Sequence, residues 1–188
     1  AGNIWVGTDG DGLHRLDHVS GKWSVFHHIA GDTGSIIVDN IFNVAEDLDG
    51  HIWCATTEGV CRLDTSSGKF TCYRHDEKNP GSPGADFLNG GVYVDRRGTV
   101  WIGTYGGGLN RFVPETGSFI RYTSNPENPY SIGCNNIASI GEDRSGILWV
   151  GTDGGGLYKT YLGKENYAYH HPANLKTSAY DIRDVYCD

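Results

Sequence analysis

Four tryptophans recur along the chain at a constant interval of 48 residues. Each occupies the third position of a similar strip, and the four strips read NIWVGT, HIWCAT, TVWIGT and ILWVGT. The tryptophans of these strips are Trp5, Trp53, Trp101 and Trp149, whereas Trp23 stands outside the series. An internal period of about 40–50 residues is typical of architectures in which each repeat forms one small structural unit. The chain is therefore constrained to a fold that such a unit builds by repetition.

Three further strips follow the same period. One reads GLHRLD, GVCRLD, GLNRF and GLYKT, and the next reads GKWSVF, GKFTCY and GSFIRY, with NYAYH as a looser fourth copy. The last strip precedes a tryptophan strip and reads NIFNVAEDLDG, NGGVYVDRRG, NIASIGEDRSG and finally DIRDVYCD. Short runs rich in β-branched and aromatic residues, bounded by Gly, Asp, Asn and Ser, are typical of strands between turns. Each repeat is therefore predicted to form a four-stranded antiparallel sheet.

Such sheets predict an all-β protein, a β-propeller whose blades are the four repeats. Outward from the central channel, we expect the NIFNVAED strip, the tryptophan strip, the GL strip and the aromatic strip. A strand from Asp181 to Cys187 is expected to complete the first blade. The arithmetic allows a closed four-bladed ring and equally a part of a larger propeller, since about four to eight blades are common. We expect a single domain over 1–188, with repeats at 2–49, 50–97, 98–145 and 146–188.

Composition narrows the classes of partner. Glycine accounts for 28 of the 188 residues, about twice its usual share of about 7%, which suits many tight turns. The net charge of −8 disfavours nonspecific binding to nucleic acid or to anionic membranes. No apolar run is long enough for a membrane span. The five cysteines are an odd number without C-x-x-C spacing, so they indicate neither a zinc knuckle nor a full disulfide framework and leave the redox compartment open.

The repeat motif also resembles a known family. The chain contains the pattern G-x-[IL]-W-[VI]-G-T-x-G-G-G-L-x-[RK], followed by T-G-x-F-x-x-Y, N-P-x-N-P-x-S and N-x-I-x-x-I-x-E-D-x-x-G. This pattern is similar to the two-component regulator propeller repeat, most fully from Trp101 to Gly146. The second repeat departs from the pattern with Ala55 in place of the usual glycine. Repeats of this family build the periplasmic sensor region of hybrid two-component systems, where the sensor detects polysaccharide fragments.

The resemblance implies a ligand-sensing module of an extracytoplasmic bacterial two-component sensor, located in the periplasm or outside the cell. It implies a carbohydrate fragment, an oligosaccharide or another small ligand, as the partner. It also implies further propeller repeats or a homodimer partner. The chain itself is not expected to span a membrane or to bind nucleic acid.

Residues that differ between repeats are the candidates for ligand binding. The four tryptophans recur at one place in every repeat, so we expect them to pack between blades. The long, polar loops that precede each inner strand lie on one rim, where propellers carry ligand contacts. Amides, carboxylates and an aromatic face suit a sugar ligand. The candidates on these loops are Asp39, Asn40, Asn89, Tyr130, Asn135, Tyr180 and Asp181, and the alternative that they are solvated loop residues or strand caps stays open.

No metal site or cofactor is predicted. The strips DGDG, YGGG and DGGG lack the helix and the Lys-Ser/Thr of phosphate-binding loops, so they are interpreted as hairpin turns. The pairs His27–His28 and His170–His171 lack the neighbouring ligands of a metal site. Fragments of a calcium loop without its glutamate, interpreted as structural turns, occur at Asp47, Asp49, Asp95 and Asp143.

No catalytic residue is predicted either, and an enzyme is not expected. The sequence contains neither a G-x-S-x-G elbow nor an H-E-x-x-H motif. Because a propeller can assemble an active site from several loops, two alternatives stay open. One is a propeller lyase or glycan-cleaving enzyme, motivated by the histidines and acidic residues of the loops. The other is a lectin-like protein with one weak sugar site in each blade.

Overall fold

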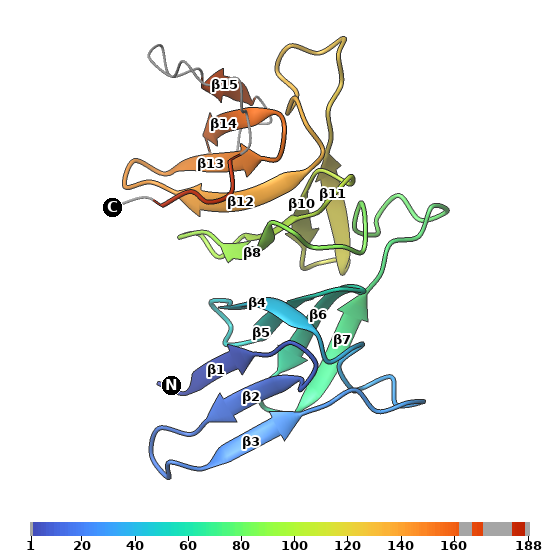
Figure 1. Ribbon diagram of the computed structural model, residues 1–188, viewed down its shortest axis with the longest axis vertical. Helices are drawn as coiled ribbons and strands as arrows, with labels where there is room; N and C mark the ends of the chain where they lie inside the picture. The colour runs from blue at the N-terminus through green and yellow to red at the C-terminus, as the bar shows by residue number, and fades with distance from the viewer. Residues whose placement is uncertain (1, 162–166, 171–181, 187–188) are drawn as a thin grey trace.

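The computed structural model describes residues 2–161, 167–170 and 182–186, which form β-strands joined by turns and loops (Figure 1). The strands make four antiparallel sheets, and each four-stranded sheet takes its first strand from the end of one sequence repeat and its other strands from the next repeat. This confirms the prediction of an all-β fold with repeated antiparallel sheets. In the described ranges no helix is long and apolar enough to cross a membrane.

The first sheet contains three strands and each of the other sheets contains four. The sheets are β1 (Ile4–Gly7), β2 (Leu13–Leu16) and β3 (Trp23–Phe26); β4 (Ile41–Glu46), β5 (Ile52–Thr56), β6 (Gly59–Asp64) and β7 (Lys69–Tyr73); β8 (Gly91–Val94), β9 (Val100–Gly103), β10 (Leu109–Val113) and β11 (Ser118–Tyr122); and β12 (Ile137–Glu142), β13 (Ile147–Thr152), β14 (Gly156–Tyr161) and β15 (Ala168–His170). Strands adjacent in sequence pair with each other throughout.

The sheets follow one another in space in the order of the chain (Figure 1). The strand β4 contacts both β1 and β8, and β8 in turn contacts β12. The first strands of the four-stranded sheets therefore form a continuous inner wall, which we define as β4, β8 and β12. The outer strands are β7, β11 and β15. This is the strand order that the sequence predicts for propeller blades.

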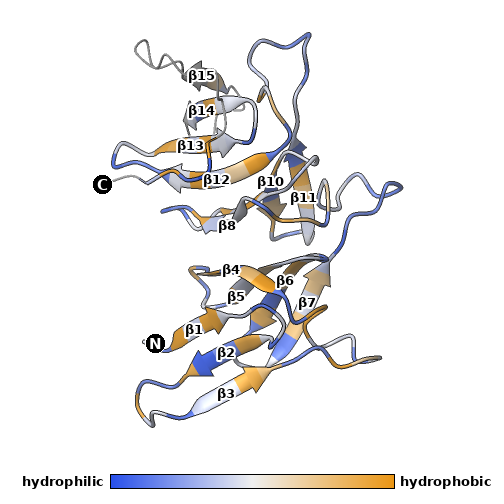
Figure 2. Cartoon of the chain, in the orientation of Figure 1, coloured by the Kyte–Doolittle hydropathy of each residue, from blue (hydrophilic) through white to orange (hydrophobic). Residues whose placement is uncertain are grey.

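Apolar side chains are buried between neighbouring sheets. One cluster joins the sheet β4–β7 to the sheet β8–β11 and contains Trp53, Leu88, Phe112 and Phe119. Two further clusters fill the junctions on either side. Figure 2 shows hydrophobic residues on the strands and mostly hydrophilic residues on the long loops after β7 and β11. Because complete burial of a large apolar side chain contributes about 1.5–3 kcal/mol, contact between sheets is the main source of stability.

The four repeated tryptophans differ in how far they are covered. Trp53 and Trp101 are buried, whereas Trp5 and Trp149 are only half-buried. The ring of Trp53 lies 4.8 Å from that of Phe112 in the next sheet, measured between centroids. The equivalent face of Trp149 belongs to the last sheet of the described chain, so no following sheet covers it there.

A basic residue lies directly opposite each tryptophan on the neighbouring strand. The Arg62 guanidinium carbon lies 5.8 Å from the ring centroid of Trp53. A cation over a tryptophan face contributes about 0.5–2 kcal/mol. The recurring Arg or Lys of the GL strip is thereby explained. The cross-strand pairs are Trp5–Arg15, Trp53–Arg62, Trp101–Arg111 and Trp149–Lys159.

An aspartate joins the turn before a tryptophan strand to the indole N–H of that strand. The bonded pairs are Asp47–Trp53 at 2.8 Å, Asp95–Trp101 at 2.9 Å and Asp143–Trp149 at 2.8 Å. The second carboxylate oxygen accepts two backbone N–H bonds of the same turn in each case. Burial raises the pKa of Asp143, but the bonds from Trp149 and the backbone outweigh it and hold this pKa below its usual range. The E-D-x-x-G strip therefore encodes a fixed turn.

A threonine closes each turn that follows a tryptophan strand. The Thr104 hydroxyl donates to the Gly108 carbonyl oxygen at 2.8 Å, and the other repeats have the same bond. Gly108 has a φ of +74°, and a Cβ there would lie 2.3 Å from the Tyr122 carbonyl oxygen. Only glycine fits such a position. The glycine strips are hairpin turns, as the sequence predicted.

Closure of the first blade is not observed. Residues 182–186 form no strand, and the rest of the expected strand from Asp181 to Cys187 lies outside the described residues. Within the described chain β1 pairs only with β2. The Ile182 N–H donates to the Thr152 carbonyl oxygen at 3.0 Å, so this segment lies against the sheet β12–β15. In the equivalent bond of the first repeat, the Ile41 N–H donates to the Thr8 carbonyl oxygen at 2.8 Å and holds the start of β4 against the first sheet.

A disulfide joins Cys61 on β6 to Cys72 on β7. The two residues are direct cross-strand partners, and Cys54 on β5 lies opposite Cys61 on its other side. Cys54 is a free thiol, completely buried, and burial raises its pKa to about 12. The odd cysteine count did not predict this bridge, because only the strand register makes residues 61 and 72 neighbours.

We expect Asp95→Ala to lower the free energy of unfolding by about 2–4 kcal/mol, because charge-assisted hydrogen bonds contribute about 1.5–3 kcal/mol each. The Asp95 carboxylate accepts three hydrogen bonds, and the residue is only 2% exposed. Urea denaturation followed by circular dichroism measures the change. Asp49→Ala is the matched control, since this exposed carboxylate lies in the equivalent turn of the preceding repeat. Equal losses in the two variants would contradict the assigned role of Asp95.

We expect the Cys54 thiol to resist iodoacetamide in the folded protein, because only a thiolate reacts and a pKa of about 12 keeps this thiol protonated. The half-buried thiol of Cys134 should react faster. Peptide mass mapping after timed labelling compares the two sites, and labelling in urea supplies the reference for full exposure. Labelling of Cys54 at the rate of Cys134 in the native protein would show that the sheet opens readily.

Candidate functional site

Two kinds of connection meet on one rim of the molecule. The short turns after the tryptophan strands are hydrogen-bonded to the ends of the long loops that lead to the next inner strand. Gly10 and Gly12 both donate to the Asp39 carbonyl oxygen, and Gly106 and Gly108 both donate to the Asn135 carbonyl oxygen, at 2.9–3.2 Å. Neighbouring sheets therefore build this rim jointly, at the end of the inner wall where β4 and β12 begin.

Several predicted ligand residues brace these loops. The Asp39 carboxylate accepts the His28 N–H at 2.6 Å, and the Asn135 side-chain oxygen accepts the Ser124 N–H at 2.7 Å. The Asn40 amide donates to the Asp9 carboxylate at 2.5 Å, which links the first two sheets. These bonds give the three side chains a role within the fold, and their part in ligand binding stays a prediction.

The other predicted residues that the structure describes, Tyr130 and Asn89, lie in different places. Tyr130 is 59% exposed on the loop before β12 and lines neither of the pockets described below. Asn89 lies between the loop and the start of β8, and it lines both pockets. Tyr180 and Asp181 lie outside the described residues. Of the five candidates that the structure describes, Asn89 alone lines these two pockets.

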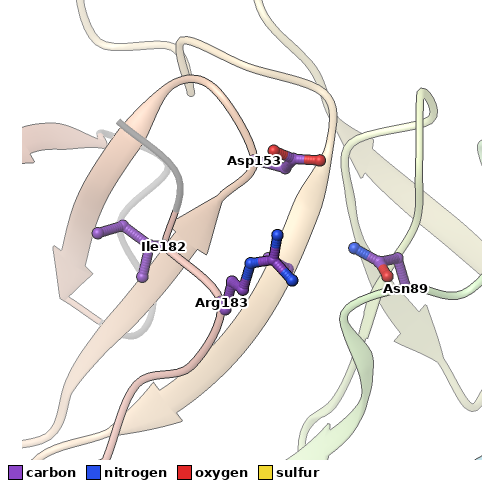
Figure 3. A pocket seen from close by; sticks show the side chains of 5 residues that line it. Asn89, Asp153, Ile182 and Arg183 are labelled. Carbon is purple, nitrogen blue, oxygen red and sulfur yellow. The ribbon is translucent and has the colours of Figure 1, made fainter. Parts of the chain in front are cut away.

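The first pocket has a volume of about 340 Å³ and opens beside β12 (Figure 3). Its side chains come from four separate parts of the chain: the loop before β8, the strand β12, the turn after β13 and the segment 182–186. Figure 3 shows the Arg183 guanidinium below Asp153 and to the left of Asn89. The lining residues are Asn89, Ala138, Asp153, Ile182 and Arg183.

A second pocket of about 290 Å³ continues the first along the inner wall. The two share Asn89 and Ala138, and the second extends to Phe42 at the start of β4. We call the combined cavity the inner-wall site. Its far end is fixed by a bond between inner strands, in which the Asn43 side-chain oxygen accepts the Val92 N–H at 2.8 Å. The site therefore rests on strands as well as on loops.

Three exposed aromatic rings adjoin this site. The centroids of Phe42 and Phe87 lie 5.7 Å apart, and those of Phe87 and Tyr105 lie 6.3 Å apart, both edge to face. The exposed fractions of these side chains are 53%, 43% and 48%. The Tyr105 N–H donates to the Phe87 carbonyl oxygen at 2.9 Å and fixes the turn beside the loop. We call these three residues the aromatic cluster.

The inner-wall site offers noncovalent recognition of a polar molecule. Asn89 supplies an amide, Asp153 an acceptor and Arg183 a cation with several donors. The aromatic cluster adds apolar faces at the Phe42 end. Concave sites that combine apolar walls with a few polar groups are typical ligand sites.

Sequence reasoning missed most of these residues, although one signal was present. The residue after the threonine of each short turn differs among repeats, as Asp9, Thr57, Tyr105 and Asp153. The sequence analysis interprets the glycine strips only as hairpin turns, so the variation at this position does not enter the prediction of ligand residues. Phe42 and Arg183 belong to strips that otherwise repeat, and only the fold shows that they share one cavity.

One further group of side chains has the composition of a metal site. Ligand atoms of Asp47, Asp49 and His51 lie within 4.8 Å of one another. The Asp47 carboxylate, however, accepts the indole N–H of Trp53 and the backbone N–H groups of residues 49 and 51. These bonds make Asp47 a part of the turn, as the sequence predicted.

The sequence of this chain is similar to a known family model and to a known protein. The family model of the two component regulator propeller matches residues 82–106 and 131–154. The chain is 30% identical over 143 residues to Histidine kinase P4 of Formosa agariphila, an alignment that covers 73% of this chain and 10% of that protein. The chain therefore spans about a tenth of the curated relative.

The fold of the chain is similar to those of two solved structures. The chain resembles the extracellular domain of the putative hybrid two component system BT4673 from B. thetaiotaomicron, with a TM-score of 0.73 and 26% identity over 98% of this chain and 23% of that one. The corresponding domain of BT3049 has a TM-score of 0.68 and 22% identity, over 88% and 21% of the two chains, and shows the fold alone.

These relatives confirm the expected periplasmic or extracellular location, since the solved chains are extracellular domains. The Cys61–Cys72 disulfide accords with it, because such bonds persist in oxidising compartments. The matched segments contain β8, β9, β12 and β13, together with the ends of the loops that precede β8 and β12. The resemblance to the two-component regulator propeller repeat is thus confirmed, over residues 82–106 and 131–154.

Proposed function

We propose that this module binds a carbohydrate fragment at the inner-wall site, as part of the ligand-sensing region of an extracytoplasmic two-component sensor. The observation that carries the proposal is the pair of adjoining pockets between Phe42 and Arg183, where an aromatic face and polar groups line neighbouring space. Sugar rings have apolar C–H faces and a rim of hydroxyls, so they suit such a combination. The likeness to extracellular domains of hybrid two-component systems supports the sensor role.

One site is favoured over a weak site in every blade. The aromatic cluster is not repeated, because Asn40 and Thr57 in the preceding sheet, and Asn136 and Asp153 in the following one, take the places of Phe87 and Tyr105. Asn40 and Asp9 are bonded to each other, which occupies their polar groups. We therefore expect a binding stoichiometry near one, unlike that of a lectin with equivalent blades.

We expect Phe42→Ala to weaken binding of the best ligand from a panel of neutral and uronic oligosaccharides about 5- to 30-fold, because it removes an aromatic face. Isothermal titration calorimetry measures the dissociation constant. Tyr130→Ala is the matched control, since it removes an aromatic side chain of similar exposure that lines neither pocket. A larger loss in Tyr130→Ala would move the site from the inner wall to the loop before β12.

We expect Asn89→Ala to weaken the same interaction about 3- to 10-fold, because a hydrogen bond contributes about 0.5–1.5 kcal/mol. The matched control is Asn79→Ala, whose amide oxygen accepts a backbone bond within the loop before β8. The wild-type protein should release no product from the bound oligosaccharide when samples are followed by chromatography over time. Time-dependent cleavage that is lost in Asp153→Asn would instead establish an enzyme.

A further inference from the structure

The loop between β3 and β4 covers the Cys61–Cys72 disulfide and leaves a pocket beside it. The pocket has a volume of about 330 Å³, and Cys72 lines it together with His28, Asp32 and Ser35, among others. Cys72 is partly exposed, whereas Cys61 is completely buried. The Ser35 carbonyl oxygen lies 4.0 Å from the Cys72 sulfur. A small molecule that enters this pocket therefore reaches Cys72 and not Cys61.

Hydrogen bonds hold the loop in place on two sides of the pocket. The Phe70 N–H of β7 donates to the Gly34 carbonyl oxygen at 2.8 Å. The ring nitrogen Nδ1 of His28 lies 2.8 Å from the Ile36 carbonyl oxygen. The pocket is thus formed by the fold itself, before any ligand enters.

The loop before β8 lies over β11 in the same way. The Phe119 N–H donates to the Gly81 carbonyl oxygen at 2.7 Å, and Nδ1 of His75 lies 2.8 Å from the Pro83 carbonyl oxygen. The two loops can therefore be compared position by position. The equivalent residues are Asp32 and Asn79, Ser35 and Ser82, and Cys72 and Arg121.

Arg121 fills the space that stays open beside Cys72. Its guanidinium donates to the carbonyl oxygens of Ser82 and Asn79 at 2.7 and 2.8 Å, and to the Ser82 hydroxyl at 2.6 Å. The corresponding acceptors beside Cys72 belong to Ser35 and Asp32, and no lysine or arginine of the described chain donates to them. Asp32 also adds a carboxylate where the other loop has an amide. The pocket therefore offers the surroundings of a cation without the cation.

We propose that this pocket binds an aminothiol of the cysteamine type, which forms a mixed disulfide with Cys72. In this adduct as many bonds separate Cβ from the ammonium nitrogen as separate Cβ from a terminal guanidinium nitrogen in arginine. The ammonium can therefore take the place that the Arg121 guanidinium has in the next sheet. It donates there to the Ser35 carbonyl oxygen and lies beside the Asp32 carboxylate, and such charge-assisted bonds are stronger than neutral ones.

The exchange needs no oxidant or reductant other than the aminothiol. Its thiolate attacks the Cys72 sulfur, a new sulfur–sulfur bond forms, and the bond between Cys61 and Cys72 breaks. The electron pair of the broken bond stays on Cys61, which takes up one proton in place of the one that the aminothiol lost. Access decides which sulfur is attacked. The adduct therefore forms on Cys72, and Cys61 becomes a buried thiol opposite Cys54.

The full chain is tested in a redox buffer of cysteamine and its disulfide, with acid quenching and peptide mass mapping. We expect the mixed disulfide to be at least about tenfold more abundant on Cys72 than on Cys61, because access selects the sulfur. In urea, where both sulfurs are exposed, the two adducts should be of similar abundance. Equal abundance on the two cysteines in the folded protein, or no adduct on Cys72, would overturn the proposal.

The class of thiol is tested with two matched probes. Mercaptoethanol and 3-mercaptopropionate replace the ammonium by a hydroxyl and by a carboxylate. Each yield on Cys72 is divided by the yield in urea, which removes differences in intrinsic reactivity. We expect this ratio to favour cysteamine over mercaptoethanol about 3- to 10-fold, and over 3-mercaptopropionate by more, because the pocket supplies acceptors and a negative charge. Equal ratios for the three thiols would contradict a cation site.

Asp32→Asn tests the charge without removing the loop contact. The Asp32 carboxylate accepts the Gly34 N–H at 2.8 Å, and an asparagine oxygen can accept the same bond. We expect the preference for cysteamine over mercaptoethanol to fall in this variant. Asp49→Asn is the matched control, since this exposed carboxylate lies in a turn away from the pocket, and the preference should stay unchanged. An equal fall in both variants would show that the preference follows net charge and would overturn the proposal.

Discussion

Burial of one sheet face against the next is the interaction on which the rest of the structure depends. A four-stranded repeat of this size cannot bury its apolar face alone, so its stability comes from its neighbours. Trp53 illustrates the point, because it is completely buried where the sheet β8–β11 covers it. Trp149 has the same basic partner within its own sheet and yet is half-buried, since no described sheet follows.

Polar contacts of the repeat make this packing reproducible. The turn aspartate holds the indole N–H, the basic residue lies over the ring, and the threonine closes the following hairpin. Each contact joins residues that are near in sequence or directly opposite in the sheet. The positions that remain free to vary are those facing the inner wall and the residue after the threonine. The candidate site occurs there because those side chains carry little of the packing.

The sequence predicted the strands closely, whereas the candidate site depends on contacts that the sequence does not reveal. Strand positions followed from the alternation of apolar strips with glycine-rich turns, because these patterns depend on local chemistry. Asn89 lines the inner-wall site together with Asp153 and Arg183, which lie 64 and 94 residues away in the chain. Asp39 and Asn135 were chosen as ligand residues for their polar groups, and the structure shows that those groups hold loop backbone.

The sequence by itself determined the repeat, the strand order within each sheet and the turns, since each depends on residues separated by a few positions. It also showed the resemblance to the two-component regulator propeller repeat, because the repeated motif is distinctive. Only the tertiary structure decided which loops share a cavity and which cysteines are bonded. Those features depend on the register between strands and on the stacking of sheets, which bring together residues that no interval in the sequence relates.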